Sequence, residues 1–157
     1  MSNFIFTTHA ACQIASMDRL RLNQHVHNGH YPCAPETVAG KTRAFDVDDI
    51  IALFFFARLL DCGQKAEFAG RTACLIRRAI RENAATDKVA VGTILASNPI
   101  QTIVPPGSDV DKVLPGGFKL LSVTEYNVAS VRVLVTESCD QMGKNSGTII
   151  GFPDGDL

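Results

Sequence analysis

The chain has 157 residues, of which 46% are hydrophobic and 20% are charged, and its formal net charge at pH 7 is −1. This composition excludes an intrinsically disordered chain, and the length is sufficient for one ordinary domain or two small ones with a buried core. The longest apolar run, IIALFFFA, is too short to cross a lipid bilayer, so we expect no membrane partner.

Charge and cysteine content give two further expectations. Residues 1–83 carry ten Lys and Arg against eight Asp and Glu, whereas residues 84–157 carry five against eight. The first part is therefore slightly basic, which favours an anionic partner for it. The five cysteines form no CxxC motif, and the chain starts with no charged-then-apolar signal segment. We therefore expect a cytoplasmic protein whose thiols are free.

Two short helices are predicted at the start of the chain. Thr7 or Thr8 can cap a helix through HAACQIA, because a threonine hydroxyl accepts a hydrogen bond from a backbone N–H of the first turn. Asp18 can cap a second helix, RLRLNQHVHN, and Gly29 follows it as a typical helix-ending residue. We expect Leu22 and Val26, which are four residues apart, to face the core from this second helix.

A loop with two prolines and two longer helices come next. Asp46 is the expected cap of the third helix, FDVDDIIALFFFARLLDCG, with further acidic residues in its first turn and Gly63 at its end. The fourth helix is predicted over about residues 65–83, with apolar side chains on one face. Arg77, Arg78 and Arg81 would then form a solvated face.

After residue 83 the pattern changes to short β-branched runs. These runs are KVAVGTILA, IQTIV, GFKLLSV, VASVRVLV and GTIIGF, separated by turn residues such as Asn-Pro and Pro-Pro-Gly. Each run predicts a strand. We therefore expect an α+β protein, with a helical domain in residues 1–84 and a β-rich module in residues 85–157.

Five motifs follow one another in the helical part: Ala11-Cys12, Ser16-Met17-Asp18, Gly29, Arg43-Ala44-Phe45 and Gly63. In order and spacing they resemble the winged-helix DNA-binding domain of the MerR family. Members of that family usually have a Leu-Ala pair and a Gly-Val-Ser turn at the first two positions. They have an Arg-x-Tyr wing motif at the fourth, and glycines after the second and third helices.

The resemblance covers about residues 5–82 and implies a winged helix-turn-helix of four helices. Residues 18–28 would be the recognition helix and residues 31–45 the wing. The chain departs from the family in the longer segment between Gly29 and Arg43. It also departs in lacking a long dimerisation helix directly after the fourth helix, so the family's effector chemistry is not implied. The resemblance predicts a sequence-specific transcriptional regulator that binds double-stranded DNA.

The recognition helix and the wing supply the candidate site. Arg, Asn and Gln side chains read guanine and adenine edges in the major groove, which is wide enough to admit a helix. Lysine and arginine in a wing suit backbone phosphates or the minor groove, although Arg43 could instead pair with Asp46 or Asp49. The candidate DNA-binding residues are Arg19, Arg21, Asn23, Gln24, His25, His27, Lys41 and Arg43.

Metal binding and catalysis are the less favoured alternatives. His25, His27, His30 and Cys33 are suitable ligand types for zinc, but His25 and His27 would point about 200° apart on a helix. The sequence has no P-loop, GxSxG, HExxH or GxGxxG motif. We therefore expect no enzyme activity, no metal and no cofactor.

Assembly completes the sequence-based prediction. Tight specific binding by a small winged helix generally requires two copies that read two half-sites. VASVRVLV, taken as an open edge strand, predicts a homodimer through the C-terminal half. Two alternatives to a transcriptional regulator are an excisionase or other architectural factor of a mobile element, and a protein-interaction module that has lost DNA binding.

Overall fold

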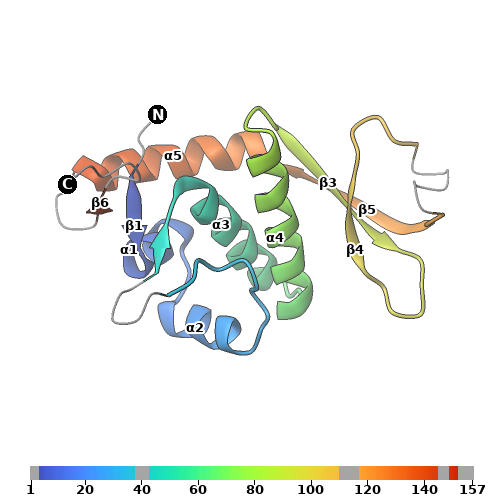
Figure 1. Cartoon of the computed structure of the whole chain (residues 1–157), viewed down its shortest axis with the longest axis horizontal. Helices are drawn as coiled ribbons and strands as arrows, with labels where there is room; N and C mark the ends of the chain where they lie inside the picture. Colours follow the sequence, from blue (N-terminus) through green and yellow to red (C-terminus); the bar gives the residue numbers. More distant parts are fainter. Residues whose placement is uncertain (1–3, 38–42, 110–116, 145–148, 152–157) are drawn as a thin grey trace.

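The computed structural model of the protein describes residues 4–37, 43–109, 117–144 and 149–151. The helices are α1 (Thr8–Ala15), α2 (Arg19–His27), α3 (Val47–Asp61), α4 (Ala66–Glu82) and α5 (Val128–Lys144). The strands are β1 (Ile5–Thr7), β2 (Ala44–Phe45), β3 (Lys88–Ile94), β4 (Gln101–Val104), β5 (Leu120–Asn127) and β6 (Ile149–Gly151). The fold is α+β, with two small antiparallel sheets (Figure 1).

The first four helices begin at or next to the residues that the sequence predicted. The Thr7 hydroxyl accepts a hydrogen bond from the backbone N–H of Ala10 at the start of α1. The Asp18 carboxylate does the same for Arg21 at the start of α2. After α2, Gly29 has a φ of 76°, a left-handed conformation that glycine adopts without steric cost. The capping predictions are confirmed because they depend on interactions within one turn of the chain.

The apolar helix α3 is the centre of the molecule, and α1, α4 and α5 pack around it (Figure 1). A helix that is apolar on every side has to be covered on every side, which explains this position. Phe56 is fully buried and stacks on Tyr31 with ring centroids 4.6 Å apart, and Phe55 meets the edge of Tyr126 in β5. No described helix is both long and apolar enough to span a membrane.

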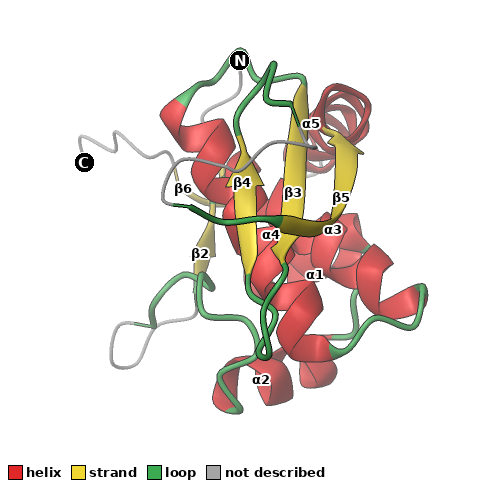
Figure 2. Ribbon diagram, turned by 90° about the vertical axis from the view of Figure 1, so that its right-hand side faces the viewer, coloured by secondary structure: helices red, strands yellow, loops and turns green. Residues whose placement is uncertain are grey.

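The two sheets occupy different places in the fold. In the first sheet, of order β2-β1-β6, the C-terminal strand β6 pairs with β1 near the start of the chain. In the second, of order β4-β3-β5, the strands lie side by side, and β4 and β3 contact α4 (Figure 2). The Gln101 side chain attaches this second sheet to α4, because its amide donates to the carbonyl oxygen of Phe68 at 3.2 Å and to the Thr72 hydroxyl.

One predicted strand is wrong. VASVRVLV forms the first half of α5, a helix of 17 residues that starts after Asn127, whose side chain accepts a hydrogen bond from the backbone N–H of Ser130 at 3.0 Å. Val128 and Val135 are both fully buried, and their seven-residue spacing places them on one face of a helix. Burial of this face outweighs the preference of β-branched residues for strands. The part after residue 84 is therefore not purely β-structure.

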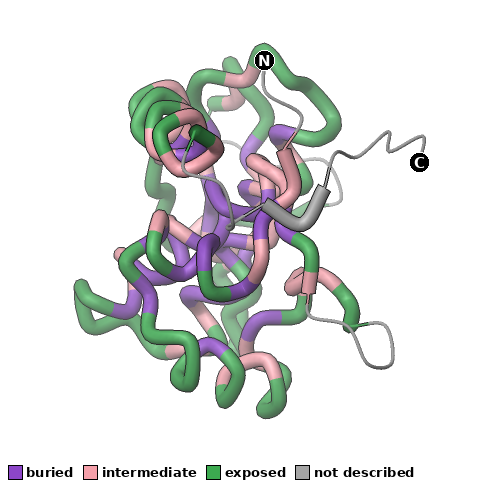
Figure 3. The backbone as a smooth tube through the Cα atoms, turned by 90° about the vertical axis from the view of Figure 1, so that its left-hand side faces the viewer, coloured by how far each residue is buried: buried purple, intermediate pink, exposed green. Residues whose placement is uncertain are grey.

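Residues on both sides of residue 84 share one hydrophobic core. Val128, Val135 and Cys139 of α5 belong to the same cluster as the buried residues of α1 and α3, and so do Val89 and Val91 of β3. Figure 3 shows that the buried backbone is concentrated in the interior of the molecule and that exposed segments surround it. The first four helices are therefore not packed independently of the rest of the chain.

The expectation of free thiols throughout is also wrong. Cys33, in the loop after α2, is bonded to Cys74 of α4; the two Cα atoms lie 5.6 Å apart, and the residues are separated by 41 positions in the sequence. Sequence spacing could not predict this bond, because only the packing of α4 against the loop brings the residues together. Cys12 and Cys139 are buried free cysteines, and burial raises the pKa of each thiol, to about 11 and about 12 respectively.

Candidate nucleic-acid interface

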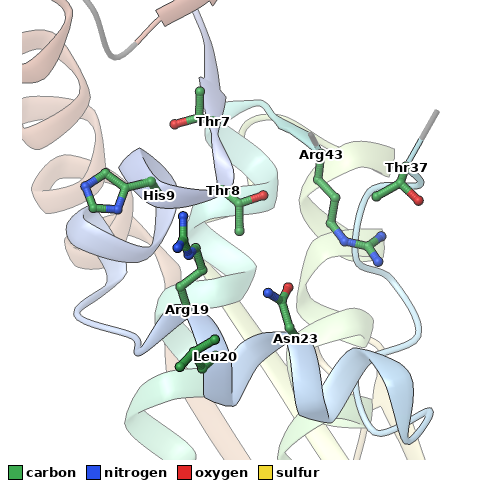
Figure 4. A pocket seen from close by; sticks show the side chains of 8 residues that line it. All are labelled: Thr7, Thr8, His9, Arg19, Leu20, Asn23, Thr37 and Arg43. Atoms are coloured by element: carbon green, nitrogen blue, oxygen red, sulfur yellow. The ribbon is translucent and has the colours of Figure 1, made fainter. Parts of the chain in front are cut away.

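An open hollow of about 530 Å³ lies between the start of α1, the first turn of α2 and the residue before β2. Figure 4 shows Arg19 and Asn23 pointing from α2 into this hollow, with His9 on one side and Arg43 on the other. The residues that line it are Thr7, Thr8, His9, Arg19, Leu20, Asn23, Thr37 and Arg43. We call this feature the α1–α2 hollow.

Two features of α2 direct side chains into the hollow. Leu22 is fully buried and Val26 packs against the core, so the helix is held by one face, as the sequence predicted. Arg19 and Asn23 lie one helical turn apart on the adjoining face and are exposed. Both side chains can therefore reach a ligand without disturbing the core.

The angle between α1 and α2 depends on the turn that joins them. Ser16 is the only non-glycine residue with a positive φ, 52°, within the described ranges. The backbone N–H of Met17 donates to the carbonyl oxygen of Cys12 at 2.9 Å, and the Arg58 guanidinium of α3 donates to the carbonyl oxygen of Ser16 at 3.1 Å. These bonds fix α2 relative to α1 and thereby set the shape of the hollow.

The hollow is positively charged on two sides. Arg19 contributes a guanidinium from α2, and Arg43 contributes another from the opposite wall. Among the described residues that line the hollow there is no carboxylate, while Asn23 adds hydrogen-bond donors. Guanidinium groups bind phosphate oxygens with charge-assisted hydrogen bonds. The α1–α2 hollow is therefore suited to an anionic ligand with polar edges.

Arg43 does not form the pairs with Asp46 or Asp49 that the sequence left open. Its guanidinium donates instead to the carbonyl oxygen of Pro35 in the same loop. This bond uses only part of the donor capacity of a guanidinium, which has five N–H groups. The remaining donors can serve a ligand in the hollow.

Asp46 and Asp49 pair with α4 instead. The Arg77 Nε atom lies 2.7 Å from an oxygen of Asp49, and Arg81 lies 2.8 Å from Asp46 and 3.1 Å from Asp49. Burial and the neighbouring Asp46 raise the pKa of the Asp49 carboxyl, while its hydrogen bonds to the Asp46 backbone and to Arg77 lower it. The expectation of a fully solvated arginine face on α4 is therefore wrong for Arg77 and Arg81, which hold α4 against α3.

The other candidate residues lie elsewhere. Arg21, Gln24 and His27 are exposed on α2 but do not line the hollow, because they lie further around or along the helix. Lys41 lies outside the described residues. Of the described wing residues that follow Thr37, Arg43 lines the hollow.

His25 faces the protein rather than the hollow. Its Nδ1 atom lies 3.4 Å from Nδ1 of His30, and its ring meets the edge of the Phe56 ring with centroids 5.5 Å apart. Burial lowers the pKa of His25, and the nearby Arg21 and His30 lower it further. The lowered pKa favours the neutral imidazole, which is a poorer partner for phosphate than the charged form.

The suggested metal ligands do not converge in the described part of the chain. Cys33 is consumed by its bond to Cys74, and His27 is exposed on another side of α2 from His25. Within the described ranges, no group of three or more His, Cys, Asp or Glu side chains is placed to hold a metal ion. The histidines of SMDRLRLNQHVHNGHY therefore have separate surroundings.

Five residues of the hollow were not anticipated as site residues from the sequence: Thr7, Thr8, His9, Leu20 and Thr37. His9 and Thr37 come from segments outside the predicted recognition helix, and only the fold brings them to it. Leu20 is apolar, so a search for polar base-reading side chains passes over it. Its signal in the sequence is its position, next to Arg19 and two residues from the core residue Leu22.

Comparison with known proteins gives no identification, because no protein-family model and no curated protein matches the chain. The geometry and residue chemistry of the α1–α2 hollow therefore carry the functional argument.

Proposed function

We propose that the protein is a sequence-specific DNA-binding protein, most simply a transcriptional regulator and not an enzyme. In this proposal α2 is the recognition helix of a winged helix-turn-helix, and double-stranded DNA is the ligand of the α1–α2 hollow. The observation that carries the proposal is the convergence of Arg19, Asn23 and Arg43. These residues come from two separate segments and line one hollow.

The chemistry of these side chains suits duplex DNA. The major groove is about 12 Å wide and admits a helix, and arginine and asparagine form bidentate hydrogen bonds with guanine and adenine edges respectively. We assign these base contacts to Arg19 and Asn23 because both are exposed and point away from the core. Arg43, on the opposite wall, is assigned to a backbone phosphate, since phosphate contacts position a protein along the duplex.

The order of elements also supports a winged helix-turn-helix. Strand β1 precedes α1 and α2, and β2 pairs with β1 immediately before α3. This agrees with the order expected from the resemblance to the MerR family, in which a wing separates the recognition helix from the supporting helix pair. The ion pairs between α3 and α4 give that support a rigid connection.

A homodimer is part of the same proposal, with a different surface from the one first expected. Strand β5 is the last strand of its sheet, so its outer edge pairs with no strand in the described part of the chain. Leu121 and Val123 on this strand are 61% and 37% exposed. An exposed edge with apolar side chains favours pairing with a second chain. Two copies joined in this way would bind a DNA site of two-fold symmetry.

The test is selection of bound fragments from a random or genomic DNA pool, followed by affinity measurements on the selected duplex. Arg19→Ala and Asn23→Ala should each weaken binding by about 1–3 kcal/mol and relax the preference at particular base pairs. Arg71→Ala and Asn98→Ala are matched controls at exposed positions outside the hollow and should bind like the unaltered protein. Failure to select any sequence, or unchanged binding by both hollow variants, would refute the proposal.

A further inference from the structure

Leu20 is the most exposed of the large hydrophobic side chains in the described part of the chain, with 70% of its surface accessible. It projects from the first turn of α2 into the α1–α2 hollow, beside Arg19 and one turn from Asn23 (Figure 4). Single exposed leucines are common on protein surfaces and need no explanation by themselves. This one differs because the charged groups around it attract a polar, anionic ligand.

The core does not require Leu20. Leu22 fills the core position of this helix and is fully buried, and residues two apart on a helix point about 200° from one another. Leu20 therefore faces the ligand side of α2. Its neighbour at the hollow, Asn23, is polar and exposed, and so is Gln24, which lies one turn further along the helix outside the hollow. A leucine among them offers a ligand an apolar contact that no other residue of this face provides.

Base edges in the major groove present mainly hydrogen-bond donors and acceptors. The exception is the methyl group on C5 of thymine, which apolar side chains recognise by contact. We propose that Leu20 reads the C5-methyl group of a pyrimidine, in unmodified DNA a thymine, in the base pair next to those contacted by Arg19 and Asn23. This inference rests on the proposed function, because a duplex in the hollow is what brings a methyl group to Leu20.

The contact adds specificity that the polar residues cannot supply. Arginine and asparagine contact the edges of purines. These two residues therefore specify a pyrimidine only indirectly, through the purine with which it pairs. A leucine against the methyl group distinguishes thymine from cytosine on the strand that it faces. Leu20 would therefore act as a specificity-determining residue, without a charge to strengthen binding to unrelated DNA.

Replacement of thymine by uracil in the selected duplex tests this contact, because it removes the methyl group and leaves the base pairing intact. Each thymine is replaced in turn, and dissociation constants are measured for the unaltered protein and for Leu20→Ala. Uracil at one position of each half-site should weaken binding by the unaltered protein roughly three- to fivefold. Leu20→Ala should bind the thymine and uracil duplexes equally. Leu95→Ala, at a 57% exposed leucine outside the hollow, should keep the difference.

A second duplex series identifies the source of the methyl group. 5-Methylcytosine placed at the same position in an otherwise uracil-containing site should restore part of the affinity to the unaltered protein and none to Leu20→Ala. If no thymine position responds to uracil, or if Leu20→Ala responds as strongly as the unaltered protein, the inference is overturned while specific DNA binding stands. If no DNA sequence is selected at all, it is the proposed function that fails.

Discussion

The helical body, comprising α1–α4 with β1 and β2, and the projecting sheet β4-β3-β5 differ in how completely they bury apolar surface (Figure 1). In the body, Leu20 is the one large hydrophobic side chain among the most exposed in the described part of the chain. The sheet and its connecting loops hold five others: Leu95, Ile100, Phe118, Leu121 and Val123. The body therefore buries its large hydrophobic side chains except at the α1–α2 hollow, whereas the sheet leaves several of them exposed.

The interactions that stabilise the body also differ from those that attach the sheet to it. The body is fixed by helix caps, by the pairs of Arg77 and Arg81 with carboxylates of α3, and by the disulfide between Cys33 and Cys74. The sheet is joined to the body by Gln101, by a ring contact between Tyr126 and Phe55, and by Val89 and Val91 of β3, which belong to the shared core. On the proposed function, the body would present the DNA-binding hollow and the sheet would supply the dimer interface.

The largest predicted effect concerns α5, which connects the two regions. Val135 is fully buried and Val133 is 58% exposed, although residues two apart would share a face in a strand. Val135→Asp should lower the free energy of unfolding by more than about 4 kcal/mol, because it buries an unpaired charge. Val133→Asp should change it by about 0.5 kcal/mol or less. Urea denaturation followed by circular dichroism measures both, and equal destabilisation would contradict the position of α5 in the shared core.

An intermediate effect is expected at the edge of the sheet. Leu121→Lys and Val123→Lys place charges along β5, and like charges across a two-fold interface repel. Each should raise the dissociation constant of the homodimer by about tenfold, measured by sedimentation equilibrium without DNA. Val133→Lys is the matched control, since this exposed valine lies on α5. A dimer that is disrupted by the control and not by the β5 variants would move the interface from the sheet to α5.

The smallest predicted effect concerns Arg43 in the body. Arg43→Ala should weaken binding to the selected site and to unrelated DNA by similar factors and reduce the slope of log affinity against log salt by about one unit. Arg71→Ala on α4 is the control and should leave the slope unchanged. A lower melting temperature with unaltered DNA affinity would show instead that the bond from Arg43 to Pro35 is only structural.

Local interactions explain why much of the helical part could be predicted. Thr7, Asp18 and Asp46 accept hydrogen bonds from residues three positions later, so a short window of sequence contains both partners. The assignment of Leu22 to the core and of Arg19 and Asn23 to the outside followed from helical periodicity in the same way. The strand prediction for VASVRVLV failed because a short apolar run of β-branched residues is compatible with both a buried strand and a buried helix.

The candidate site was predictable only in part for a similar reason. Periodicity placed Arg19 and Asn23 on one face, but it gave no information on what would lie opposite them. His9 and Thr37 enter the hollow because the α1–α2 turn and the loop before β2 fold against each other. His25 lies on the same helix as the base-reading candidates, but its side chain packs against His30 and Phe56 and does not face the hollow.

The sequence by itself determined the α+β class, the starts of the first four helices and the outward face of α2, since these depend on bonds within one or two turns. The tertiary structure decided the helical state of residues 128–135, the pairing of β6 with β1 and the bond between Cys33 and Cys74. It also decided which arginines of the first part stay available to a ligand. Each of these outcomes depends on residues that are distant along the chain and meet only when α3 is covered on all sides.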